Sequence, residues 1–100
     1  SQAEVGRLVA ETRARDSEEK SRKDLEVVVR QLDGLVANTM RSVQALEGKL
    51  SADEQRRILE AIESAKKAKG RPEAAIDELR RHLAEMEKAA QVIGQAMLRP

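Results

Sequence analysis

The chain contains no phenylalanine, tyrosine, tryptophan or cysteine in its 100 residues. Sandwiches and barrels draw heavily on aromatic and β-branched side chains, so the missing aromatics disfavour an all-β fold. Without cysteine there is no disulfide framework and no thiolate metal site. This absence suits a reducing compartment, and we expect a cytoplasmic protein.

Long apolar runs and an excess of one charge sign are also missing. No stretch approaches the roughly 18 apolar residues of a membrane span, and no secretory signal is present. The 19 basic and 18 acidic side chains leave a net charge of only +1, whereas a nucleic-acid footprint needs a basic excess on one face. We therefore expect neither a membrane nor a nucleic acid as partner.

Helix breakers are scarce, with two prolines and five glycines. The commonest residues are good helix formers, so the chain is predicted to be all-α. No Ser/His/Asp arrangement and no glycine-rich phosphate loop stands out, which predicts no catalysis, cofactor or metal in this chain. A two-carboxylate metal site formed by His82 with Glu78 and Glu85 is a minor alternative to an exposed helical histidine.

The most regular pattern is a seam of residues spaced alternately by four and three between positions 25 and 50, which is typical of a heptad helix ending near Gly48. The seam consists of Leu25, Val29, Leu32, Val36, Thr39, Val43, Leu46 and Leu50. A shorter stripe precedes it at Val5, Leu8, Val9 and Thr12. The charged stretch 13–24 between them either breaks, with Asp16 or Ser17 capping a second helix, or continues. We favour one straight helix in the isolated chain.

Two further helices follow. Ser51 and Glu54 have the spacing of a capping box, and Gly70 is expected to end that helix after three lysines that suit its dipole. Pro72 fits the first position of the last helix, whose core seam is Ile76, Leu79, Leu83, Met86, Ala90, Ile93 and Met97. Short connections imply antiparallel neighbours. We therefore predict a three-helix bundle from residues 36 to 98 and a helical arm from 2 to 36.

The arm is predicted to lack a partner because the second and third helices are shorter than the first. An unburied apolar stripe implies a binding partner. The expected docking or dimer face consists of Val5, Leu8, Leu25, Val28, Val29 and Leu32. Two hypotheses stay open: the arm docks on another domain, or the chain self-associates through residues 2–36 as a coiled-coil dimerisation module.

The basic cluster of Lys66, Lys67, Lys69 and Arg71 is a candidate contact for an acidic partner or nucleic acid. Without aromatic side chains to stack bases, single-stranded nucleic acid is disfavoured. Complementation of the helix dipole is the preferred interpretation.

Several motifs occur in the order seen in one known family. They are Glu18-Glu19-Lys20 with Arg22-Lys23, the turn Gly48-Lys49-Leu50-Ser51-Ala52-Asp53-Glu54, Ile58 with Ile62, Lys69-Gly70, and Ala74-Ala75-Ile76. The match as a whole covers almost all of residues 4–98. The ordered set resembles the C-terminal helical lid of the substrate-binding domain of DnaK-type heat-shock protein 70 chaperones.

The resemblance implies a short helix, a long helix and a compact bundle. In that family the lid closes over a β-sandwich that holds an unfolded client peptide, and ATP in a separate domain opens it. It implies a chaperone of protein folding and the stress response, with the sandwich of the same parent chain as partner and clients as indirect partners. Asp33 matches the family's lid carboxylate that reaches an arginine beside the peptide cleft, a charge-assisted latch. The alternative interpretation of Asp33 is a surface pair with Arg30 or Arg41.

Overall fold

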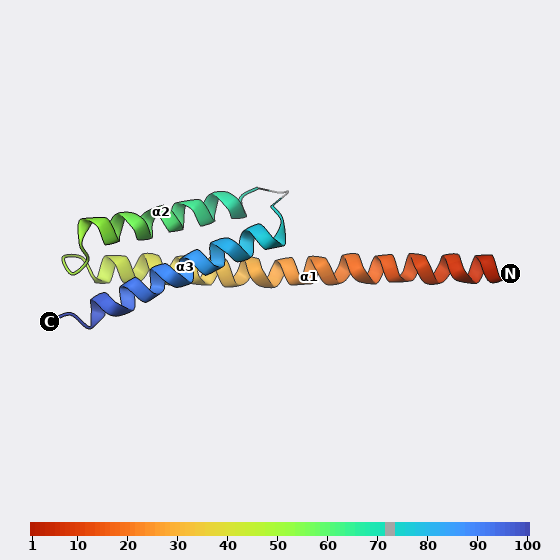
Figure 1. Cartoon of the computed structure of the whole chain (residues 1–100), viewed down its shortest axis with the longest axis horizontal. Coiled ribbons are helices and arrows are strands. Elements are labelled where there is room, and N and C mark those ends of the chain that lie inside the picture. Colours follow the sequence, from red (N-terminus) through yellow and green to blue (C-terminus); the bar gives the residue numbers. More distant parts are fainter. Residues whose placement is uncertain (72–73) are drawn as a thin grey trace.

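The computed structural model describes residues 1–71 and 74–100, which form three helices and no strand. They are α1 (Gln2–Ala45), α2 (Ala52–Lys69) and α3 (Ile76–Met97). The all-α prediction is confirmed, and the arrangement is a long helix leading into a helical bundle (Figure 1).

The charged stretch 13–24 does not break α1, so the short and long helices that the resemblance implies are one continuous helix here. The stretch contains neither glycine nor proline. Glu19 also pairs with Arg22 and Lys23 one turn further along, at 3.8 and 3.7 Å. Such pairs support a solvated helix by a few tenths of a kcal/mol, on the order of 0.3 each.

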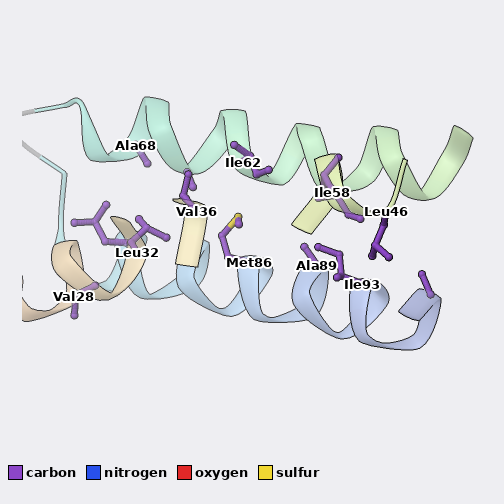
Figure 2. Close-up of a cluster of buried hydrophobic side chains, with 14 residues drawn as sticks. Val28, Leu32, Val36, Leu46, Ile58, Ile62, Ala68, Met86, Ala89 and Ile93 are labelled. Atoms are coloured by element: carbon purple, nitrogen blue, oxygen red, sulfur yellow. The ribbon is translucent and has the colours of Figure 1, made fainter. Parts of the chain in front are cut away.

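The bundle runs up, down and up again: α2 is antiparallel to α1, and α3 returns parallel to α1 while packing against both other helices (Figure 1). Its core is a continuous set of apolar side chains from all three helices, several of which Figure 2 shows pointing between the ribbons. The buried members are Val28, Leu32, Val36, Val43, Leu46, Ile58, Ile62, Ala65, Ala68, Leu79, Met86, Ala89, Ile93 and Ala96.

The bundle begins earlier than expected. Leu25 already packs against the core, Val28 is buried and Leu32 is fully buried. The 22 residues of α3 span about 33 Å, which is about the length of α1 from Leu25 to its C-cap, Leu46. The third helix is therefore long enough to cover this part of the seam, and the boundary placed at residue 36 was wrong. The free arm comprises residues 2–24.

The ends of α2 follow the sequence signals. The Ser51 hydroxyl accepts from the Glu54 amide at 3.1 Å, and the Ser51 amide donates to the Glu54 carboxylate at 2.9 Å. This confirms the capping box. Gly48 adopts φ +89° in the turn after α1, a left-handed conformation that favours glycine, and Gly70 caps the end of α2.

The start of α3 lies at Ile76, with Ala75 as its N-cap. The expectation that Pro72 opens this helix falls outside the described residues. At the other end, Met97 is 61% exposed and is not part of the core seam.

The chain is elongated, with extents of 75 × 23 × 15 Å and a radius of gyration of 19.8 Å. A compact domain of this length would have a radius of gyration of about 13 Å. The difference comes from the N-terminal half of α1, which projects away from the bundle (Figure 1).

Candidate interaction surface

The arm carries an exposed apolar stripe. Val5 and Leu8 are each 61% exposed, and Val9 and Thr12 lie beside them. The Thr12 hydroxyl donates to the Leu8 carbonyl at 2.8 Å, so its polar group is satisfied within the helix. Together with Arg13, three of these residues line a shallow hollow on the arm. Nothing in the described part of the chain covers this surface.

The arm stripe and the core seam lie on opposite faces of α1. Successive residues of an α-helix are rotated by about 100°. Over the length of α1 this places the centre of the arm stripe roughly 180° from the centre of the core seam. The six residues predicted to form one docking face are therefore divided between two faces.

Only Val5 and Leu8 of that predicted face point away from the bundle. The other four, Leu25, Val28, Val29 and Leu32, pack in or against the core, and Figure 2 shows Val28 and Leu32 at one end of the buried cluster. Val28 and Leu32 are buried, so an outside partner could reach them only if the first turns of the bundle unfolded, whereas Leu25 and Val29 are partly buried. These residues are covered because α3 is long enough to pack along α1 as far as Leu25.

Asp33, the latch candidate, has a partner within the chain. Its carboxylate accepts from the ammonium of Lys69, the last residue of α2. The alternative partners considered from sequence, Arg30 and Arg41, instead donate to the Glu26 carbonyl and the Asn38 side chain. The Asp33 side chain is still 46% exposed, so it lies at the surface.

The basic cluster at the end of α2 is largely neutralised. Lys67 pairs with Glu63 at 3.3 Å, Lys69 pairs with Asp33, and Arg71 pairs with Glu78. These contacts fasten one end of the bundle. They pair three of the four basic residues of the cluster with carboxylates.

A second ionic contact stabilises the opposite end of the bundle. Arg99, beyond α3, donates from both guanidinium NH2 groups to the two oxygens of Glu54 at 2.6 Å, and one of them also approaches the Lys49 carbonyl at 3.4 Å. The hydrogen bond from Arg99, followed by the one from the Ser51 amide, lowers the pKa of Glu54 from 4.5 to about 2. Sequence reasoning found the capping role of Glu54 but missed Arg99, since nothing local links residues so far apart.

His82 lines an open surface pocket of about 560 Å³ between α2 and α3, together with Ser64 and Glu85. The minor metal alternative required Glu78 as well, and that carboxylate is held by Arg71. Among the described residues, no group of three His, Cys, Asp or Glu side chains is placed to hold a metal.

Comparison with known proteins does not assign the chain to a family. No family model matches it, and no solved structure matches it. Within the described residues, none of the three helices combines the length and apolarity that crossing a membrane requires.

Proposed function

We propose that this chain is the helical lid of an ATP-dependent, DnaK-type chaperone, closing over a bound unfolded peptide and gating its release. The proposal is supported by the ordered motifs between residues 18 and 76 and by the lever-like geometry of α1. In this proposal the chain is not an enzyme and binds no cofactor itself. ATP acts through a separate domain of the parent protein, which we place in the cytoplasm.

The observation that carries the proposal is the unpartnered arm. Residues 2–24 project from the bundle and expose Val5 and Leu8 on the side away from the core. An exposed apolar surface of this kind marks an interaction site. A β-sandwich subdomain of the same parent chain would receive this stripe, while residues 25–98 move with the arm as one body.

The gating mechanism requires two states of similar free energy. Docking of the arm must be worth only a few kcal/mol, about 2–5, if a nucleotide-driven change elsewhere is to reverse it. Asp33 contributes to the closed state by exchanging Lys69 for an arginine at the edge of the peptide cleft. Because Lys69 already holds the carboxylate, only the difference between the two ion pairs stabilises closure.

The test uses the full-length parent carrying Val5→Lys and Leu8→Lys together. Placing two ammonium groups in the apolar contact should weaken docking, and release of a fluorescent hydrophobic peptide should become several-fold faster. Leu59→Lys is the matched control, because Leu59 is exposed on α2, away from the arm. Peptide release at the wild-type rate in the double variant, or equal acceleration by the control, would contradict the lid function.

A second candidate function is a stand-alone helical bundle that dimerises through its arm. The observation favouring it is that the arm stripe faces away from the chain's own core, where a second helix can reach it. A parent gene without a β-sandwich and nucleotide-binding domain would decide in its favour.

A further inference from the structure

We propose that the outward face of α1 is self-complementary and pairs two copies of this chain antiparallel, with the twofold axis between Glu19 and Lys20. This pairing does not rest on the lid function. It uses the same stripe, so a docked arm and a paired arm are mutually exclusive.

The outward face is a single ladder along α1, with successive members three or four residues apart. It consists of Val5, Val9, Thr12, Asp16, Glu19, Lys23, Val27, Arg30, Gly34 and Ala37. All ten are exposed. Because this ladder lies roughly opposite the core seam, α2 and α3 leave it open along its whole length.

The proposed axis brings apolar and small residues together. Thr12 of one copy lies over Val27 of the other, which is 48% exposed, and Val5 lies over Gly34. Val9 meets the aliphatic stem of Arg30, which can cover apolar surface while its charge stays in water.

Gly34 gives independent support. A glycine inside a helix costs about 1 kcal/mol relative to alanine, yet a Cβ built at Gly34 would meet no atom within 4 Å in this chain. No contact within the monomer requires its missing side chain. In the antiparallel pair the gap accommodates the Val5 side chain of the second copy.

The charges select the antiparallel direction. About the proposed axis, Asp16 of each copy faces Lys23 of the other, and Glu19 faces Lys20. A parallel pair in register would set Asp16 against Asp16 and Lys23 against Lys23, and like charges at such positions oppose association.

The size of the interface suits a weak, closed dimer. The overlap from residue 2 to residue 37 is about 54 Å long, and a contact strip about 10 Å wide buries roughly 1,000 Å² over both copies. Specific interfaces begin near this size. Because the contact is isologous, it closes at two copies and does not extend into fibres.

Cysteine cross-linking tests the geometry without interference, since the natural chain has no cysteine. Under mild oxidation, Thr12→Cys with Val27→Cys should give a disulfide-linked dimer, while Thr12→Cys alone should stay uncross-linked. Positions 12 and 27 lie about 22 Å apart along one helix, too far for a bond within a chain. Efficient cross-linking of the single variant would show a parallel pair and overturn the proposal.

Charge reversal tests the pairing. In sedimentation equilibrium, Asp16→Lys and Lys23→Asp should each weaken dimerisation at least several-fold, because each creates two like-charge contacts. An equimolar mixture of the two variants should recover the wild-type association. If the charge variants associate like the wild type, or if the wild type stays at its monomer mass of 11.1 kDa at hundreds of micromolar, on the order of weak-interface affinities, the proposal fails. The monomeric outcome leaves this face to the surface of another protein, and the peptide-release test of the lid is unaffected.

Discussion

Glu54 shows how one side chain joins local and distant structure. Its carboxylate caps the start of α2 by accepting from the Ser51 amide, and it also accepts hydrogen bonds from both NH2 groups of the Arg99 guanidinium. A bidentate arginine contact is directional and stronger than a neutral hydrogen bond. It fixes the segment after α3 to the turn between α1 and α2.

The first prediction concerns the stability of the protein at low pH. The pKa of Glu54 falls from 4.5 to about 2 on folding, so its contribution to stability is complete above about pH 4.5 and is lost as the pH falls towards 2. In Arg99→Gln the folded pKa should rise towards 4.5, because the largest cause of its depression is removed. The urea midpoint of the variant should therefore lie below that of the wild type at pH 6, and the gap should narrow at pH 2.

Lys88→Gln serves as the control, since Lys88 makes an exposed contact with Glu85 on one helix. Its urea midpoint should track the wild type across this pH range. A constant gap between Arg99→Gln and the wild type from pH 6 to pH 2 would show that Glu54 carries no such pH dependence.

Local signals at single residues could be predicted, and distant pairs could not. Ser51 and Glu54 are three residues apart, so their spacing alone identifies the cap. The pairs Asp33–Lys69 and Glu54–Arg99 depend on which helix ends meet in space. Composition and periodicity contain no information on that choice, and surface pairs form with whichever charge lies nearest.

At the scale of elements, α1 is one continuous helix whose two halves differ in burial. Its second half is a bundle helix with one buried face, and its first half is an arm with an apolar stripe on the opposite face. The sequence predicted the helices, the two caps of α2 and the heptad seam. It misplaced the start of the bundle because the length of α3 was underestimated. A projection at about 100° per residue would have separated Val5 and Leu8 from Leu25 and Leu32.

The second prediction separates the two faces. Leu32→Ala removes a fully buried side chain and should lower the free energy of unfolding by about 2–5 kcal/mol. Leu8→Ala, at an exposed position, should change it by no more than about 0.5 kcal/mol. Urea denaturation at low protein concentration measures both. Equal effects would mean that the arm and the seam share one core.

At the scale of the whole molecule, the arm and the bundle differ in what holds them together. The bundle has a core from three helices and ionic contacts at both ends. The arm depends on local pairs and on propagation of helix from the bundle, and an unsupported helix in water is marginal. Binding to an outside surface would therefore order the arm as well as bury its stripe. Either proposed partner would in this way stabilise the helical state of the arm.

Amide hydrogen exchange tests this division most directly. In the dilute, monomeric chain, backbone amides within helices from residue 28 onward should share the slow exchange of a cooperative unit. Amides of residues 6–24 should exchange orders of magnitude faster, and their protection should rise as the protein is concentrated. Arm amides as slow as those of the bundle in the monomer would contradict the account, because they would require a partner surface within the chain itself.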